Sequence, residues 1–289
     1  MSLPFLITAS ELSSVINHVA DEVVILDCRA DLTDLAAGRQ AFESSHIPSA
    51  VFADLENDLA LPPHWRAPEQ GRHPLPNVDD WLATLRRWGI SSHTQVVAYD
   101  NAGGAMASRA WWMLRWAGVG RAQLLDGGWQ AWLAHHPEAV ESGPEQDKTP
   151  SDLGVSEPLV KTVSTQELQN GLQNPSATAR LIDARALPRY RGEAEPIDPV
   201  AGHIPGAMCV PFNENLDANG FFLPAEELAQ RFAPLADADP LISYCGSGVT
   251  AAHNIFAMHL AGITHAKLYV PSWSGWSANT DNPIATGDE

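Results

Sequence analysis

The stretch that decides the fold is Leu241-Ile-Ser-Tyr-Cys245-Gly-Ser-Gly-Val-Thr250, which continues as Ala-Ala-His-Asn-Ile-Phe-Ala-Met-His-Leu. A short apolar run leads into one cysteine and two glycines, and the residues that follow have the apolar spacing of a helix. The pattern predicts a strand, a tight loop and a helix, with the Cys245 thiol at the start of the loop. Glycines let several backbone N–H groups face one point, and the first turn of a helix adds unpaired N–H groups. We therefore expect a cradle that stabilises an anionic sulfur and makes Cys245 a nucleophile.

The composition is that of a soluble globular protein. The chain has 289 residues, of which 45% are hydrophobic, which suffices for two domains with separate cores. It contains no apolar run of about 18 residues, and its N-terminus lacks the basic region of a secretory signal. The three cysteines, Cys28, Cys209 and Cys245, form no CxxC pair and no cluster at zinc spacing. We expect neither a disulfide framework nor a metal, and a reducing cytoplasm as the location.

The charge balance limits the partners. With 17 basic and 35 acidic residues the formal net charge is −18, which argues against nucleic acid and anionic membranes. An anionic substrate would need positive charge concentrated at its site. An acidic tandem protein also suggests a monomer.

The two halves of the chain repeat each other. Five landmarks recur in order, at offsets of 156 (167 − 11), 156, 157, 145 and 144: Glu11 and Glu167, Asp27 and Asp183, His46 and His203, Asp100 and Cys245, Trp129 and Trp273. The offset falls by about a dozen residues because the first half has extra loop, which we place around 61–76. We predict two homologous domains, residues 1–142 and 159–289, joined by a linker at 143–158 with turn-forming composition.

Each half has the pattern of a parallel α/β unit. Capping boxes begin helices after Thr8 and Ser164. Strands are expected near 23–26, 96–99, 122–125, 180–182, 241–244 and 267–270, and further helices near 78–88, 106–117, 224–232 and 249–261. This alternation predicts an α/β fold in which helices cover both faces of a mainly parallel sheet. Ligands bind such sheets at the carboxyl ends of the strands, where Cys245 falls.

The repeat also separates the two halves chemically. The counterpart of Cys245 is Asp100, whose carboxylate cannot hold a sulfur atom covalently. One half is therefore expected to have kept the chemistry and the other to be catalytically inactive. A cysteine phosphatase needs an arginine six residues after its cysteine, and Ala251 occupies that position.

These motifs resemble those of the two-domain sulfurtransferases of the rhodanese superfamily, and within it the 3-mercaptopyruvate sulfurtransferase branch. The resemblance rests on the repeated Asp-x-Arg, the His-Ile-Pro-Gly-Ala and the Cys-Gly-Ser-Gly-Val-Thr-Ala, and covers roughly residues 5–285. It implies two tandem rhodanese-like domains and transfer of a sulfane sulfur from 3-mercaptopyruvate, through a persulfide on Cys245, with release of pyruvate. The implied acceptor is a thiol, reduced thioredoxin or cyanide, and no cofactor is implied.

The resemblance also implies roles for loop residues. Thiosulfate-using members place Arg and Lys directly after the cysteine, whereas this chain has the uncharged Gly246 and Ser247. Mercaptopyruvate is therefore the expected donor, bound by the loop residues Gly246, Gly248, Val249 and Thr250. In that branch the serine, here Ser247, is joined by a histidine, which we assign to His46. Asp34 is the nearest candidate for its acidic partner.

The donor carboxylate is expected to bind arginine. Arg189 matches the first carboxylate-binding arginine of the family, because a guanidinium can hold a carboxylate by two hydrogen bonds. Many members have a second arginine after a Glu-Pro, where this chain has Ile197, so Arg191 is the candidate replacement. A loop of the first half with Arg72 and His73 could border the cleft, but no motif supports a role for it.

Other features are expected to be structural, and alternatives to the main hypothesis stay open. The two Asp-x-Arg pairs occur in both halves, so they are interpreted as ion pairs of the fold, and Cys28 and Cys209 as inert thiols. The first alternative function is a thiosulfate:cyanide sulfurtransferase. The second is a non-catalytic sulfur carrier or interaction module in which Cys245 is a buried, inert residue.

Overall fold

The computed structural model describes residues 4–19, 22–174, 176 and 178–288. The chain divides into two compact units. Unit 1 comprises Met1–Pro62, Pro76–Leu159 and Ala218–Phe222, and unit 2 comprises Pro63–Leu75, Val160–Asp217 and Leu223–Glu289. Most of the segment expected as a linker belongs to unit 1. The segment Pro63–Leu75, which the sequence analysis counted in the first domain, belongs to unit 2.

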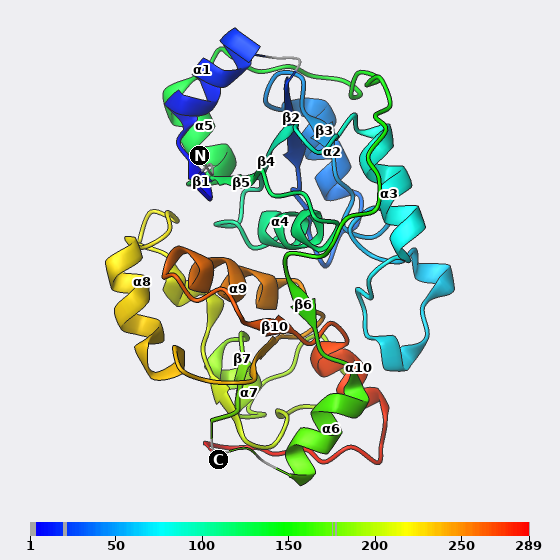
Figure 1. The fold of residues 1–289 in the computed structure, drawn as a ribbon, viewed down its shortest axis with the longest axis vertical. Helices are drawn as coiled ribbons and strands as arrows, with labels where there is room; N and C mark the ends of the chain where they lie inside the picture. The colour runs from blue at the N-terminus through cyan, green and yellow to red at the C-terminus, as the bar shows by residue number, and fades with distance from the viewer. Residues whose placement is uncertain (1–3, 20–21, 175, 177, 289) are drawn as a thin grey trace. The chain divides into compact units, whose positions relative to one another are not determined.

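Unit 1 is built on a parallel sheet of five strands in the order β1-β5-β4-β2-β3 (Figure 1). Its elements are β1 Leu6–Ile7, α1 Ala9–Val19, β2 Val23–Asp27, α2 Ala37–Ser44, β3 Val51–Phe52, α3 Val78–Arg87, β4 Gln95–Tyr99, α4 Ala107–Trp116, β5 Ala122–Leu125 and α5 Gly128–His135.

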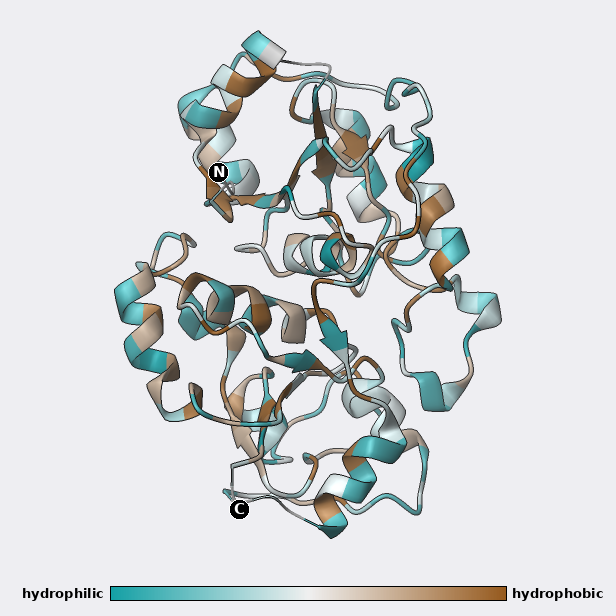
Figure 2. Ribbon diagram, viewed as in Figure 1, coloured by the Kyte–Doolittle hydropathy of each residue, from teal (hydrophilic) through white to brown (hydrophobic). Residues whose placement is uncertain are grey.

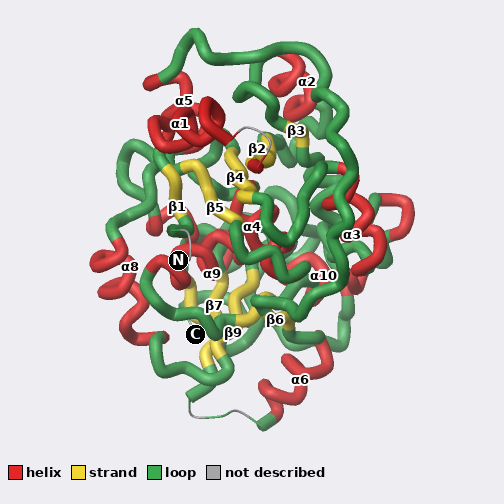
Figure 3. The backbone as a smooth tube through the Cα atoms, turned by 45° about the horizontal axis from the view of Figure 1, so that its top comes forward, coloured by secondary structure: helices red, strands yellow, loops and turns green. Residues whose placement is uncertain are grey.

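Unit 2 repeats this topology with the strand order β6-β10-β9-β7-β8, again all parallel. Its elements are the 3-10 turns η2 Pro63–Trp65 and η3 Pro68–Gln70, then β6 Lys161–Thr162, α6 Thr165–Gln173, β7 Arg180–Asp183, α7 Leu187–Tyr190, β8 Ala207–Cys209, η4 Phe212–Asn215, α8 Ala225–Phe232, η5 Ala233–Leu235, β9 Leu241–Tyr244, α9 Thr250–Leu260, β10 Lys267–Leu268 and α10 Ser272–Ala278. In each unit the strands are flanked by helices (Figure 3).

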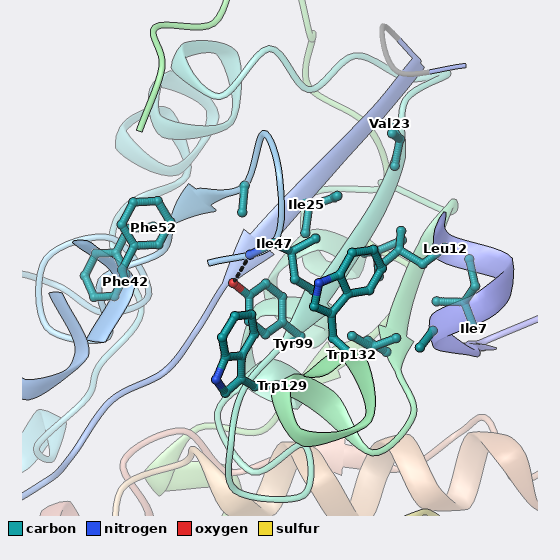
Figure 4. Packing of buried hydrophobic residues seen from close by; sticks show 14 residues of the cluster. Ile7, Leu12, Val23, Ile25, Phe42, Ile47, Phe52, Tyr99, Trp129 and Trp132 are labelled. Carbon is teal, nitrogen blue, oxygen red and sulfur yellow. Dashed lines mark hydrogen bonds between the residues drawn. The ribbon is translucent and has the colours of Figure 1, made fainter. Parts of the chain in front are cut away.

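The cores form because the central strands are apolar on both faces. Every residue of β2 and of β4 is buried, as expected for strands covered by helices on both sides. Figure 4 shows part of the core of unit 1, in which Tyr99 and Trp132 pack beside the aliphatic side chains of β2. The covering helices are amphipathic, and α3 shows apolar and polar turns in Figure 2. No helix in the described ranges is long and apolar enough to span a bilayer.

The predicted α/β fold with mainly parallel sheets is confirmed. All six expected strands are present, and both capping boxes form: the Ser164 side chain accepts a hydrogen bond from the Glu167 amide, and Thr8 does the same for Glu11. The sequence analysis missed the edge strands β1, β3, β6 and β8, because two or three residues are too short to show a periodic pattern.

Candidate active site

The repeated Asp-x-Arg motifs stabilise the carboxyl ends of β2 and β7. Arg29 donates to both carboxylate oxygens of Asp27 at 2.6–3.0 Å, and Arg185 holds Asp183 in the same way. Each guanidinium also donates to a backbone carbonyl at 2.7 Å, and all four residues are buried. The identical geometry in both units supports the structural role expected for these pairs.

His46 has a structural environment that its counterpart His203 shares. His46 Nδ1 bonds to the Phe42 carbonyl at 2.8 Å and the ring stacks on Phe42, with centroids 3.9 Å apart. His203 Nδ1 bonds to the Tyr190 carbonyl at 2.7 Å and stacks on Tyr190 at 3.8 Å. Both rings are buried. The His-Ile-Pro histidines thus anchor the chain in each unit.

Cys245 lies where β9 ends and the loop to α9 begins. The side chain is only 2% exposed, and the Gly248 amide donates to its Sγ at 3.1 Å. Gly248 adopts φ +80°, a conformation that favours glycine. The backbone N–H of Cys245 donates to Ser272 Oγ at 3.2 Å, and the carbonyl accepts from the Trp273 amide at 2.9 Å. Helix α10 therefore fixes the position of the nucleophile from below the loop.

The equivalent loop of unit 1 is occupied by its own carboxylate. Asp100 Oδ1 accepts from the amides of Ala102 and Gly104 at 2.8 and 2.9 Å. Asp100 Oδ2 accepts from the amides of Met106 and Ala107 at 2.7 and 2.9 Å. This loop has the geometry of an anion cradle, and the cradle is filled by a side chain of the same loop.

The histidine bonded to Ser247 is His73. His73 Nδ1 and Ser247 Oγ share a hydrogen bond of 2.8 Å, and both side chains are buried. Sequence reasoning assigned this position to His46, because His46 lies in a recognisable motif. His73 lies in a loop without one. The available signal was the drop in repeat offset, which marked residues around 61–76 as an insertion in the first half.

The segment Pro63–Leu75 reaches Ser247 by packing on α10. Gly71 has φ +82°, and a Cβ at this residue would lie 2.4 Å from the Pro271 carbonyl oxygen. A Cβ at Gly275 would lie 2.8 Å from the Glu69 carbonyl oxygen. Only glycines allow so close an approach at both positions. The Arg72 amide then donates to Ser274 Oγ at 3.0 Å, which places the side chains of Arg72 and His73 at the Cys245 loop.

Arginine side chains lie over the same loop. A Cβ at Gly246 would lie 2.9 Å from Arg72 Nη2 and 3.4 Å from Arg189 Nη2. Arg189 donates to Glu195 at 2.7 and 3.0 Å and to Asp198 at 3.1 Å, and Arg72 donates to Asp198. The positive charge that an anionic substrate needs in this acidic chain is therefore present at Gly246.

The carboxylates of this cluster titrate differently. Burial raises the pKa of Asp198, although its contacts with Arg72 and Arg189 favour the charged form. Burial alone would also raise the pKa of Glu195. Hydrogen bonds from Arg189 and from the amides of Asp198 and Ile197 outweigh burial and leave the Glu195 pKa below its ordinary value.

The remaining expected site residues are distributed as follows. Val249 precedes α9, and Thr250 is its first residue. Arg191 donates to the Asp288 carboxylate at 2.5 and 2.9 Å rather than to Glu195 or Asp198. The Ile197 side chain is 44% exposed. Asp34 Oδ1 accepts the Ala36 amide in an exposed turn of unit 1.

The other two cysteines are not activated. Burial, together with the charges of Asp100 and Asp27, raises the pKa of Cys28 well above the usual value. Burial and the nearby Asp183 raise the pKa of Cys209 to about 11. Both thiols are therefore protonated at neutral pH, in agreement with the inert role expected for them.

Comparison with known proteins places the two units in one family. The model of the rhodanese-like domain matches residues 8–135 and again residues 164–279. The chain belongs to the rhodanese family. Each match covers one of the two parallel sheets, so the tandem rhodanese-like domains expected from the repeat are confirmed.

Similar members of the rhodanese family are sulfurtransferases by name. The chain is 45% identical to the "Probable 3-mercaptopyruvate sulfurtransferase" of Pseudomonas aeruginosa, over 100% of both chains. It is 38% identical to the "Putative thiosulfate sulfurtransferase SseB" of Mycobacterium tuberculosis, over 98% of this chain and 97% of that protein. Among solved structures it resembles SseA from Escherichia coli, described as a 3-mercaptopyruvate sulfotransferase, with a TM-score of 0.77 and 28% identity over 94% of this chain and 99% of that chain.

Proposed function

We propose that this rhodanese-family protein is a 3-mercaptopyruvate sulfurtransferase that moves a sulfane sulfur to a thiol or cyanide through a persulfide on Cys245. The observation that carries the proposal is the set of groups at one loop: the thiol, the Ser247–His73 pair, and the guanidiniums of Arg72 and Arg189. This set provides a nucleophile, a proton relay and a site for a carboxylate.

In the first half-reaction the Cys245 thiolate attacks the sulfur of the donor. A new S–S bond forms, the bond between the donor's sulfur and C3 breaks, and its electron pair becomes that of the pyruvate enolate. The donor's thiol proton stays on the outer sulfur, and the enolate takes a proton at carbon to give pyruvate. Ser247 is the proposed proton donor, and His73 restores its proton through their 2.8 Å hydrogen bond. His73 thus takes the role that sequence reasoning gave to His46.

In the second half-reaction an acceptor nucleophile attacks the outer sulfur of the persulfide. The S–S bond breaks and Cys245 leaves as a thiolate, which the Gly248 amide stabilises at 3.1 Å. A small thiol, reduced thioredoxin or cyanide has the required nucleophilic atom. The acceptor oxidises no group of the protein, so the cycle needs no cofactor.

Intact-protein mass spectrometry tests the proposal. Incubation with 3-mercaptopyruvate is expected to add one sulfur mass to the wild-type protein and nothing to Cys245→Ser, with pyruvate released in equal amount. If thiosulfate adds sulfur and mercaptopyruvate does not, the protein is a thiosulfate:cyanide sulfurtransferase instead.

A non-catalytic carrier or interaction module is the remaining candidate. The contrast between the loops disfavours it, since Asp100 blocks the first cradle whereas Cys245 stands free of such a carboxylate cap. The alkylation rate of Cys245 at pH 7.5 decides between them. A rate no faster than that of an unstructured cysteine peptide would favour the non-catalytic module.

A further inference from the structure

The loss of an arginine at position 197 leaves the site with an unexplained gap. Arg189 alone supplies one guanidinium for the donor carboxylate, and Arg191, the replacement expected from sequence, is engaged with Asp288. The structure contains another guanidinium at the same loop. Arg72 Nη2 lies 2.9 Å from the position of a Cβ at Gly246, closer than either terminal nitrogen of Arg189, at 3.4 and 3.5 Å.

We propose that Arg72 is the second arginine of the carboxylate-binding site, and that it replaces the residue lost at Ile197. This inference rests on the proposed function and identifies the residue that selects 2-oxo acid donors. Arg72 would hold one carboxylate oxygen of 3-mercaptopyruvate while Arg189 holds the other, with the donor sulfur directed at Cys245.

Asp198 sets the spacing of the two guanidiniums. One of its carboxylate oxygens accepts from Arg72 Nη1, and the other accepts from Arg189 Nη2 at 3.1 Å. The Asp198 side chain is 2% exposed, whereas those of Arg72 and Arg189 are 29% and 19% exposed. Asp198 therefore lies beneath the arginines, and a ligand approaching from solvent meets the guanidiniums first.

Each arginine keeps donor groups for such a ligand. Within the described part of the chain, Arg72 Nη2 and Arg189 Nη1 make no hydrogen bond, while the other terminal nitrogen of each is bonded to Asp198. Guanidinium N–H groups bind a carboxylate with matched geometry. The two nitrogens left over flank Gly246, where the absence of a side chain leaves room for a small anion.

The arginines are held in place by a chain of alternating charges. Asp183 pairs with Arg185, Arg185 with Glu195 at 3.2 Å, and Glu195 with Arg189 at 2.7 Å. Asp198 then connects Arg189 to Arg72. The positive and negative charges in this chain balance, so its end at Arg72 is a preorganised donor group rather than an excess of charge. Binding a carboxylate requires no large rearrangement of these side chains.

The backbone at Arg72 is fixed as firmly as its side chain. The Arg72 amide donates to Ser274 Oγ, and its carbonyl accepts from Arg66. Gly71 lies against the Pro271 carbonyl in a conformation that other residues rarely adopt. Because His73 bonds to Ser247 from the adjacent position, one short segment would supply both the proton relay and half of the carboxylate site.

Steady-state kinetics with two donors tests the role of Arg72. Arg72→Ala is expected to raise KM for 3-mercaptopyruvate about ten- to hundredfold, the loss of one charge-assisted contact. Mercaptoacetone has the same thiol and ketone but no carboxylate. It should be a poor donor for the wild type and no poorer for Arg72→Ala. Arg180→Ala, which removes an exposed arginine at the start of β7, serves as the matched control and should leave both donors unaffected.

Two further variants complete the test. Arg72→Lys keeps a cation beside Asp198 but only a point charge, so it should raise KM for mercaptopyruvate several-fold and leave mercaptoacetone unaffected. It also decides the matter if Arg72→Ala does not fold. Adding Ile197→Arg to Arg72→Ala should restore most of the lost affinity, since it returns a guanidinium after the Glu-Pro.

The outcomes separate this inference from the proposed function. A wild-type protein inactive with mercaptopyruvate refutes the proposed function itself. An active wild type with an unchanged KM in Arg72→Ala refutes only the role of Arg72. Equal losses with mercaptopyruvate and mercaptoacetone would mean that Arg72 supports the loop structurally and does not bind the carboxylate. No recovery in the double variant would refute the replacement of position 197.

Discussion

Removing the carboxylate of Asp100 tests whether the first loop is an anion cradle filled by its own side chain. Each carboxylate oxygen accepts two backbone amides, at 2.7–2.9 Å, and the residue is 1% exposed. Asp100→Ala leaves four amides facing an empty space. Asp100→Asn is the informative companion, because its NH₂ group would face two N–H donors wherever its oxygen is placed.

The magnitude follows from these four contacts. A hydrogen bond to a charged group contributes about 1.5–3 kcal/mol net, so four would sum to an upper limit of about 6–12 kcal/mol. Desolvation of the carboxylate offsets part of this, and water can enter the space in the alanine variant. We expect Asp100→Ala to lower the stability of unit 1 by about 3–5 kcal/mol, and Asp100→Asn by at least half as much, because two of the four amides lose their acceptor.

Urea denaturation followed by tryptophan fluorescence measures this loss. Of the ten tryptophans, all except Trp65, Trp273 and Trp276 lie in unit 1, so the signal reports mainly on that unit. Because Asp100 belongs to unit 1, persulfide formation on Cys245 should be unchanged where both units are folded. Sulfate or formate should raise the melting temperature of Asp100→Ala more than that of the wild type, by binding to the vacated amides. An alanine variant as stable as the wild type, with no response to anions, would refute the cradle.

Three further predictions concern unit 2 and its counterpart residues. His73→Gln should lower kcat about a hundredfold or more with little change in KM, whereas His46→Gln should keep the activity and lose stability, so steady-state kinetics and thermal melts on both variants separate relay from anchor. Asp183→Asn leaves the buried Arg185 guanidinium without its main counter-ion and should cost about 3–5 kcal/mol in chemical denaturation. Because the Glu195 pKa is lowered in the folded state, its contribution to stability is present above its unfolded pKa of about 4.3 and is lost as the pH falls through the folded value; the stability difference between wild type and Glu195→Gln should therefore shrink below about pH 4.3, and a difference that grows on acidification would contradict this.

Much of the fold could be predicted because duplication makes local patterns recur. The strand ending at Asp27 and the strand ending at Asp183 each precede an arginine two residues later, and both form the same buried ion pair. A single occurrence of this motif would leave its meaning open. Two occurrences, one of them in a half without the reactive cysteine, indicate a role in the fold. The same comparison applied to His46 and His203 would have indicated an anchor rather than a relay.

The site could be predicted only where its residues lie in the repeated frame. Cys245, Ser247 and Arg189 belong to unit 2 in sequence and in space, so motifs locate them. Arg72 and His73 lie in the first half of the sequence but in unit 2 of the structure. No periodicity identifies such a segment, because what fixes it is a close contact with α10 through Gly71, which depends on residues about two hundred positions later.

The insertion and the plugged loop have a common physical logic. After a duplication, two loops of the same type would each present backbone amides to an anion. In unit 1 the anion is supplied permanently by Asp100, which makes that loop a stable part of the fold and removes it from chemistry. In unit 2 the sulfur of Cys245 has one amide donor, so further stabilisation of negative charge must come from outside the loop. The segment Pro63–Leu75 provides it, with Arg72 over Gly246 and His73 on Ser247. On this argument the extra loop of the first half is retained because the catalytic loop of the second is incomplete without it.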